Sequence, residues 1–135
     1  FGCPRAMSFM NAVDTNVLVR LIARDEPRQV ATAEAFVAEG AWVSHVVLAE
    51  TIWVLTAVYE LGPPAIATAL EMLLNHQHIS LQDADVVAAA LGRYRAKAGM
   101  VFSDCLVLEI ARKAGHLPLG TFDRRLARLD GAEKL

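Results

Sequence analysis

The chain has 135 residues and a mass of 14.7 kDa, the usual size of a single domain. Hydrophobic residues make up 55% of it and the mean hydropathy is +0.35, which excludes an intrinsically disordered chain. Charged residues interrupt every apolar run before it reaches the roughly 18 residues that a membrane span needs. The net charge of -2 excludes a wholly basic domain but not a local basic patch that binds nucleic acid.

The two cysteines, Cys3 and Cys105, are too few for a disulfide framework, and neither has a partner at zinc-site spacing. We therefore expect a reducing, cytoplasmic setting with no membrane association. Residues 1–9 lack the basic and apolar regions of a signal peptide and fit poorly with the pattern that follows. We expect them to be an expression remnant or a disordered N-terminus, ahead of a single domain over residues 10–135.

Short β-prone segments alternate with longer helical segments along the rest of the chain. In chain order, the elements we predict are a buried strand at Met10–Val13, helices at Val17–Arg24 and Arg28–Glu39, a strand at Ala41–Ser44, helices at His45–Tyr59 and Ala65–Asn75, a strand at His78–Ser80, helices at Asp83–Ala98 and Asp104–Ala114, a strand at Leu117–Gly120, a helical turn at Arg124–Arg128 and an edge strand at Ala132–Leu135. Short apolar strands joined by helical crossovers predict an α/β fold with a parallel sheet covered on both faces.

Several predicted helix ends carry residues suited to that position. Ser44 and Ser103 are expected N-caps, and Pro63 or Pro64 opens the helix that follows Gly62. In a parallel sheet, ligands bind beyond the carboxyl ends of the strands, so the residues just after the strands matter most for function.

Four acidic residues stand at such places or in the helices between them. Asp14 follows the first strand, Glu50 lies inside an apolar helix, Asp104 opens a later helix, and Asp123 follows the strand that ends near Gly120. Each also has a simpler interpretation. Asp14, Asp104 and Asp123 suit helix starts, and Glu50 could lie on a narrow solvent-exposed stripe with Thr51, or with Trp53 and Val54 flanking it.

Taken together, the four carboxylates predict a cation site, because like charges repel one another unless a cation neutralises them. Oxygen ligands without histidine favour hard ions such as Mg²⁺ or Mn²⁺, which serve phosphoryl chemistry. Competing chemistry is not signalled, because the sequence has no glycine-rich phosphate loop and no nucleophile elbow. The four histidines lack metal-ligand spacing, and Cys105 is expected in the core.

These residues, in this order, resemble the PIN-domain ribonucleases, and more narrowly the VapC-type toxins of type II toxin–antitoxin systems. The resemblance runs from about Met10 to the C-terminus. It lies in the segments Ala12–Leu18, Ser44 with Ala49 and Glu50, Phe102–Leu106, and Leu119–Asp123. It implies a three-layer α/β/α fold around a central parallel sheet of four to five strands.

The resemblance also implies a Mg²⁺- or Mn²⁺-dependent endoribonuclease that cuts structured RNA such as tRNA or rRNA. Asp14, Glu50, Asp104 and Asp123 match the catalytic, metal-binding acids. The supporting polar residues it implies are Thr15, Asn16, Ser103 and Thr121. The candidates for RNA contact are Arg20 and Arg24 after the first acid and Arg124 and Arg125 after the last.

A nuclease toxin implies a cognate VapB-like antitoxin, and the resemblance further implies a homodimer. Trp53 and Tyr59 could supply apolar area for one of these contacts, or they could belong to the core. Three alternatives remain open: a housekeeping PIN nuclease in RNA maturation, a non-catalytic PIN-like module that binds RNA or protein, and a phosphatase with an aspartate after its first strand. The phosphatase would need a second aspartate where this chain has Asn16.

Overall fold

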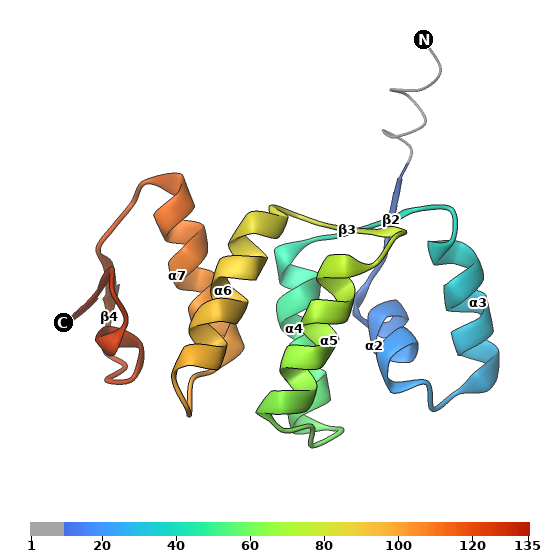
Figure 1. Cartoon of the computed structure of the whole chain (residues 1–135), viewed down its shortest axis with the longest axis horizontal. Helices are drawn as coiled ribbons and strands as arrows, with labels where there is room; N and C mark the ends of the chain where they lie inside the picture. The colour runs from blue at the N-terminus through green and yellow to red at the C-terminus, as the bar shows by residue number, and fades with distance from the viewer. Residues whose placement is uncertain (1–9) are drawn as a thin grey trace, which may run out of the picture. The chain divides into compact units, whose positions relative to one another are not determined.

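The computed structural model describes residues 10–135, so the expectation for residues 1–9 lies outside the described residues. The chain forms two compact units, of which the first ends at Gln82 and the second is Asp83–Leu135 (Figure 1). Short strands alternate with helices along the chain, as the sequence predicts.

The first unit contains a three-stranded parallel sheet with the strand order β1-β2-β3. Its strands are β1 (Asn11–Ala12), β2 (Ala41–Val43) and β3 (Ile79–Leu81). In the register, Asn11 lies beside Ala41, which in turn lies beside Ile79. The predicted first strand, Met10–Val13, is confirmed in part: β1 consists of Asn11 and Ala12, both are exposed rather than buried, and within residues 10–135 the strand lies at the edge of the sheet beside β2. Val13, directly after β1, is buried.

Within the described residues, the first unit also has the helices α2 (Thr15–Ala23), α3 (Pro27–Val37), α4 (His45–Ala57) and α5 (Pro63–Asn75). Proline occupies the first turn of α3 and of α5, where the missing N–H costs no helical hydrogen bond. Ser44 caps α4 by accepting a hydrogen bond of 3.1 Å from the Val47 N–H, as predicted. The core of the unit is made by fully buried helical side chains: Leu18, Leu48, Leu55, Ile66, Leu70 and Leu73.

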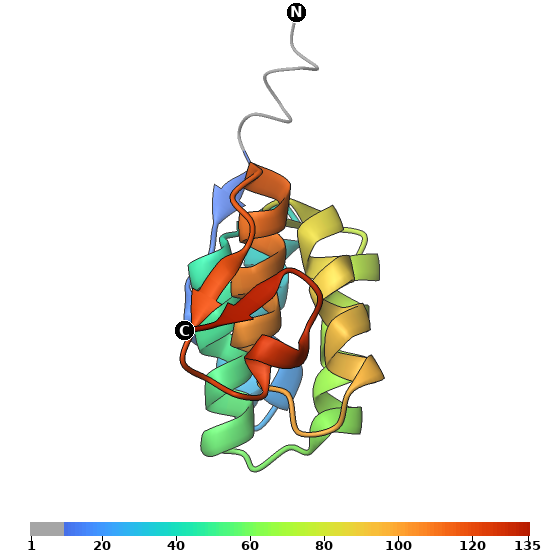
Figure 2. The same cartoon turned by 90° about the vertical axis from the view of Figure 1, so that its left-hand side faces the viewer.

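The second unit contains α6 (Ala84–Ala96), α7 (Phe102–Ala114), β4 (Leu119–Thr121), a short 3₁₀ helix η1 (Leu126–Arg128) and β5 (Ala132–Lys134). Helices α6 and α7 bury Val87, Leu91 and Leu106. Phe102, also buried, meets the Tyr94 ring edge to face, with the ring centroids 6.0 Å apart. Strands β4 and β5 form a parallel pair beside η1 (Figure 2). The predicted C-terminal edge strand is therefore confirmed.

A buried carboxylate ties the second unit together. Glu109 on α7 is only 5% exposed, and it forms ion pairs with Arg93 of α6 at 3.3 Å and with Arg112 at 3.1 Å. Arg112 also donates a hydrogen bond to the Asp130 carbonyl, just before β5. Two arginines offset the desolvation of one acid, so this network links α6, α7 and the β4–β5 segment.

The predicted α/β class with parallel strands is confirmed, and the sheet differs in its extent. The described residues hold five strands, divided between the three-stranded sheet and the β4–β5 pair, rather than one sheet of four to five strands. The strands are short, and each ladder spans only two or three residues. Within residues 10–135, no helix is both long enough and apolar enough to cross a membrane.

Candidate active site

Asp14 is the residue that ends the turn between β1 and α2. Its side chain caps α2, because Oδ1 accepts a hydrogen bond of 3.2 Å from the Val17 N–H. The simple interpretation of Asp14 as a helix cap is therefore confirmed. The cap uses one oxygen of an exposed carboxylate, which leaves Oδ2 available to a cation.

Glu50 lies on the exposed side of α4. The buried positions of this helix are Leu48, Thr51, Ile52 and Leu55, which follow one another at helical spacing and turn Glu50 away from the core. The predicted solvent-exposed stripe is confirmed, and Trp53, at 66% exposure, shares that side rather than the core. Glu50 still has a specific partner, because Thr15 Oγ1 donates a hydrogen bond of 2.9 Å to Glu50 Oε1. The first turn of α2 thus holds the carboxylate of α4.

Asp104 lies in the first turn of α7, as predicted. Burial raises the pKa of its carboxyl group above the ordinary value of 3.8, and the negative charge of Asp123 raises that pKa further. Asp104 and Asp123 are thus electrostatically coupled acids in the second unit. Two carboxylates whose negative charges repel each other favour a shared proton or a bound cation.

Asp123 is held by backbone hydrogen bonds. Its Oδ1 accepts a bond of 2.7 Å from the Arg125 N–H and another of 3.0 Å from the Leu126 N–H. Thr121 Oγ1 accepts a bond of 2.9 Å from the Asp123 N–H, so Thr121 fixes the turn that presents the acid. The expectation that Thr121 supports Asp123 is consistent with this contact.

Ser103 does not cap α7 as predicted. The helix begins one residue earlier, at Phe102, and Val101 occupies the N-cap position without a side-chain hydrogen bond to the helix. Phe102, the first residue of the helix, is buried. Ser103 thus lies in the same turn as Asp104.

The structure brings the four predicted acids together as two pairs, each within one unit. Asp14 and Glu50 are linked through the α2–α4 contact made by Thr15. Asp104 and Asp123 interact electrostatically, because the negative charge of Asp123 raises the pKa of Asp104. No group of three or more histidine, cysteine or acidic side chains that could hold a metal ion is found within residues 10–135.

The four predicted RNA-contact arginines differ in how they are held. Arg20 donates hydrogen bonds to Gln29 and Tyr59 and pairs with Asp25 at 3.4 Å. Arg24 pairs with Glu34 at 3.0 Å, so much of its charge is neutralised. In the second unit, Arg125 Nη1 donates a bond of 3.1 Å to the Gly99 carbonyl. Arg124 is exposed, and among the described residues it has no side-chain partner.

A cavity of about 700 Å³ opens next to Asp14 in the first unit. It is lined by Ala12, Val13, Asp14, Asn16, Val17, Arg20, Arg28, Gln29, Thr32, Ala33 and Phe36. Sequence reasoning found Asp14, Asn16 and Arg20 but missed Arg28, Gln29 and Phe36. The available signal was the spacing of Arg28, Thr32 and Phe36, which places them on one side of a helix that starts at Pro27.

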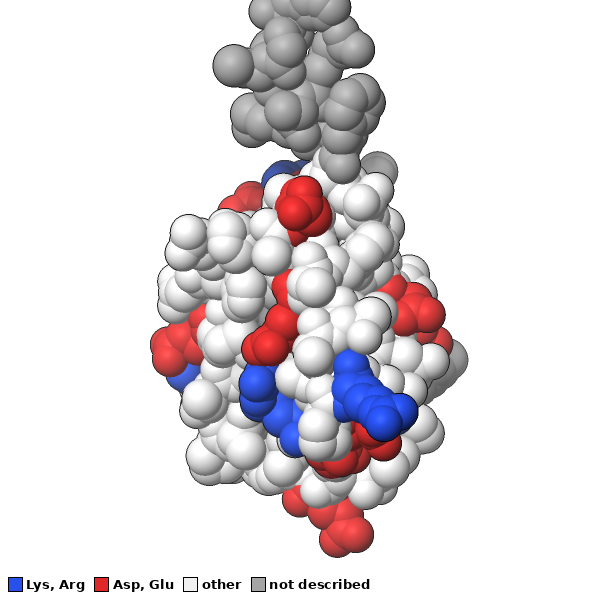
Figure 3. All heavy atoms as spheres, turned by 90° about the vertical axis from the view of Figure 1, so that its right-hand side faces the viewer, with Lys and Arg blue, Asp and Glu red and all other residues white. Residues whose placement is uncertain are grey.

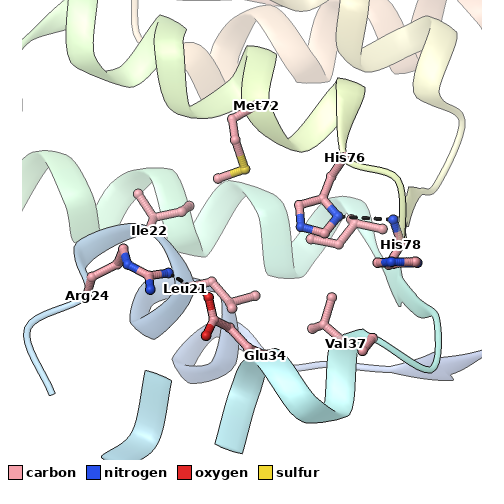
Figure 4. A pocket seen from close by; sticks show the side chains of 10 residues that line it. Leu21, Ile22, Arg24, Glu34, Val37, Met72, His76 and His78 are labelled. Atoms are coloured by element: carbon pink, nitrogen blue, oxygen red, sulfur yellow. Dashed lines mark hydrogen bonds and ion pairs between the residues drawn. The ribbon is translucent and has the colours of Figure 1, made fainter. Parts of the chain in front are cut away.

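A second cavity of about 480 Å³ lies between α2, α3 and the end of α5 (Figure 4). Apolar side chains such as Met72 line it, and the Arg24–Glu34 ion pair and two histidines line its polar part. The His78 N–H donates a hydrogen bond of 3.1 Å to His76 Nδ1. His76 thus has a structural partner in its own turn, in keeping with the predicted structural or solvated role of the histidines.

The charges on the α3 side of the molecule are mixed. In Figure 3, the visible lysine and arginine side chains lie beside aspartate and glutamate side chains instead of forming one basic surface. Any anion that binds here must therefore be held by individual cations and donors rather than by a broad positive field.

Three comparisons with known proteins bear on the family. No curated protein and no solved structure matches the chain significantly. The family model described as the PIN domain matches residues 12–132, which include both acid pairs and run through both units. The chain therefore belongs to the PIN domain family.

Proposed function

We propose that this protein is a metal-dependent endoribonuclease in which Asp14, Glu50, Asp104 and Asp123 act together as the metal-binding acids. PIN domains are typically metal-dependent nucleases, so the family supports a hydrolase. The observation that carries the finer proposal is the state of the four acids. Asp14, Glu50 and Asp123 are held by hydrogen bonds, the charge of Asp123 acts on Asp104, and no ion pair among the described residues neutralises any of the four acids.

The donor chemistry of these residues fits a hard divalent cation. All four offer carboxylate oxygens, which Mg²⁺ and Mn²⁺ prefer, and no thiol or imidazole competes within either pair. Burial raises the pKa of Asp104 and the negative charge of Asp123 raises it further, and a bound cation would relieve both effects. Asp14, Glu50, Asp104 and Asp123 would hold the ion, which supplies activation of a water molecule and neutralisation of charge on the attacked phosphate.

The neighbouring polar residues position the acids in this proposal. Thr15 orients Glu50 through its hydroxyl group, and Thr121 fixes the turn that carries Asp123. Asn16 lines the cavity beside Asp14, where its amide can donate to a phosphate oxygen. Arg124 and Arg125 adjoin Asp123 and would contact the RNA backbone, which positions a substrate without reading its sequence.

We further propose that the nuclease is the toxin of a toxin–antitoxin pair that cuts tRNA or rRNA in the cytoplasm. The four motifs that resemble VapC-type toxins support this proposal. An intracellular ribonuclease needs restraint, so a VapB-like antitoxin is the proposed partner, and a second copy of the chain the other. Exposed apolar side chains on α4, Val46 and Trp53, offer area for such contacts.

The test is cleavage of purified bacterial tRNA and rRNA by the full chain with Mg²⁺ or Mn²⁺, and again with EDTA. Asp14→Asn should abolish cleavage, whereas the matched control Asp130→Asn should retain it, because Asp130 is 86% exposed and pairs with Arg112 rather than with any of the four acids. Cleavage that continues in EDTA, or in Asp14→Asn, would contradict the proposal.

Two further measurements separate the toxin from its alternatives. Induced expression in growing bacteria should arrest growth with the wild-type chain and not with Asp14→Asn. Cleavage without growth arrest would favour a housekeeping nuclease. RNA binding without cleavage would favour a non-catalytic PIN-like module.

A further inference from the structure

One side of α3 faces the cavity beside Asp14. Arg28, Thr32 and Phe36 recur every four residues along this helix, and all three line the cavity together with Gln29. The stretch from Arg28 to Phe36 covers about 12 Å of helix axis, which is longer than the spacing of neighbouring phosphates along a nucleic acid strand. The cavity is therefore long enough for more than one group of an extended ligand.

The polar part of this wall consists mainly of hydrogen-bond donors. Arg28 is exposed, and its guanidinium group has no partner in the described part of the chain. Gln29 has a fixed orientation, because its Oε1 accepts a hydrogen bond from Arg20 Nε. The Gln29 amide nitrogen is thereby left with two N–H donors. This arrangement suits a ligand that brings acceptors and negative charge.

The orientation of Gln29 depends on a network behind it. Arg20 also donates a hydrogen bond of 3.0 Å to Tyr59 Oη, and Tyr59 donates one of 2.9 Å to Asp25 Oδ2. Asp25 in turn pairs with Arg20. Arg20 is thus engaged with Gln29, Tyr59 and Asp25, whereas the Arg28 guanidinium group has no partner among the described residues.

An aromatic ring is exposed on the same wall. Phe36 is 43% exposed and lines the cavity, although its neighbours Ala33 and Val37 on α3 are buried. An exposed aromatic ring beside donors and a free cation is the combination that binds single-stranded nucleic acid, since every base has an apolar face that can stack.

We propose that this cavity binds a short single-stranded segment of the RNA substrate beside Asp14, with a base stacked on Phe36 and a phosphate held by Arg28. Gln29 donates to the backbone or to a base edge in the same segment. The inference rests on the proposed nuclease function, and it adds a positioning surface on α3 that carries no catalytic group. RNA fits this cavity better than an apolar peptide, because the wall presents the Arg28 guanidinium group, which has no partner among the described residues, and the oriented donors of Gln29.

The first test is RNA affinity in the Asp104→Asn background, which removes a proposed metal ligand. The probe is a pool of short RNA hairpins with random single-stranded loops. Phe36→Leu should weaken binding about tenfold, whereas Phe36→Trp should retain it. Arg28→Gln should weaken binding and lower the slope of log affinity against log salt by about 0.7, whereas Arg28→Lys should keep the slope. The matched control is Arg128→Gln, since Arg128 is exposed and unpaired among residues 10–135.

The second test locates the base directly. Hairpins with 5-iodouridine in the loop should crosslink to Phe36 on irradiation, both in the wild-type protein without divalent ions and in Asp104→Asn. The crosslinked residue is identified by mass spectrometry, and the conservative variants Phe36→Trp and Arg28→Lys control for folding by their melting temperatures.

The outcomes separate this inference from the proposed function. If Phe36→Leu and Arg28→Gln both bind and crosslink as the parent protein does while the wild-type chain cuts RNA, the inference is overturned and the nuclease stands. The cavity would then be free for a protein partner. If RNA binds with the expected dependence on Phe36 and Arg28 but is never cut, the RNA surface stands and the nuclease proposal fails.

Discussion

Thr15 Oγ1 and Glu50 Oε1 are joined by a hydrogen bond of 2.9 Å that connects the first turn of α2 with the middle of α4. The two residues are 35 positions apart in the sequence, and the threonine adjoins Asp14, which caps the same helix. The Thr15 hydroxyl group therefore fixes the position of Glu50 relative to Asp14.

The first prediction concerns this bond. Thr15→Val should lower the cleavage rate by removing the group that orients Glu50, while Thr15→Ser should restore most of it. The free energy of unfolding should fall by no more than about 1 kcal/mol, because the bond is exposed to solvent. The measurements are single-turnover cleavage and urea unfolding of the three proteins. An unchanged rate in Thr15→Val would show that the bond serves the fold alone.

The second prediction concerns the charge of Asp104. A carboxyl group whose pKa is raised in the folded state holds its proton more tightly there than in the unfolded chain. Its contribution to stability is therefore lost as the pH rises from below its ordinary value of 3.8 through the raised pKa, and the loss persists at neutral pH. Asp104→Asn should thus leave the metal-free protein at neutral pH as stable as the wild type or more stable, and abolish cleavage.

The check on Asp104→Asn is a series of thermal melts in EDTA from pH 3 to pH 7. The advantage of the variant over the wild-type protein should grow with pH across this range. A large fall in melting temperature at neutral pH, together with retained cleavage, would instead mark Asp104 as a structural residue.

Local chemistry made much of this fold predictable from the sequence. Helix starts depend on hydrogen bonds between neighbouring residues, so the sequence alone can predict them. The structure has the predicted starts of α4 after Ser44 and of α5 after Gly62. The start of α7 was not predicted, because Ser103 suits an N-cap by its chemistry, whereas the helix begins at the buried Phe102. The exposure of β1 depends on which strands pair, and that is a long-range property.

The same distinction between local and long-range features applies to the candidate site. Asp14, Asp104 and Asp123 follow or begin predictable elements, so their places in the chain made them candidates. The bond between Thr15 and Glu50 joins two helices, and the wall of Arg28 and Phe36 becomes a cavity only when α3 packs in the first unit. Neither relationship is encoded within a single helix, so neither could be predicted without the fold.

The third prediction concerns Arg124, which is exposed and unpaired within the described part of the chain. In an inactive Asp104→Asn background, Arg124→Ala should weaken binding to all RNAs about equally and flatten the salt dependence, because fewer counterions are released. Arg125→Ala should do the same and also free the Gly99 carbonyl that Arg125 holds. Affinities over a salt series test both variants. A loss confined to one RNA sequence would indicate base reading, and an unchanged slope would exclude the residue from the RNA path.

The fourth prediction concerns Cys105, which is fully buried in α7. Burial raises the pKa of its thiol to about 11, and the nearby charges of Asp104 and Glu109 add to the effect. In a Cys3→Ser background, Cys105 should therefore react with a disulfide reagent at pH 8 only when the chain unfolds. The rate of reaction in native buffer and in guanidinium chloride measures this. Reaction in native buffer as fast as that of a free thiol would contradict the buried position.

The hydrogen bonds of Asp123 limit how this residue can serve a cation. Oδ1 already accepts from two backbone N–H groups, so Oδ2 is the oxygen that a cation would meet. In the proposed site, Asp123 would hold the ion through this one oxygen. The turn after β4 would then leave more of the ion's ligands to be supplied by water or by a phosphate oxygen of the substrate.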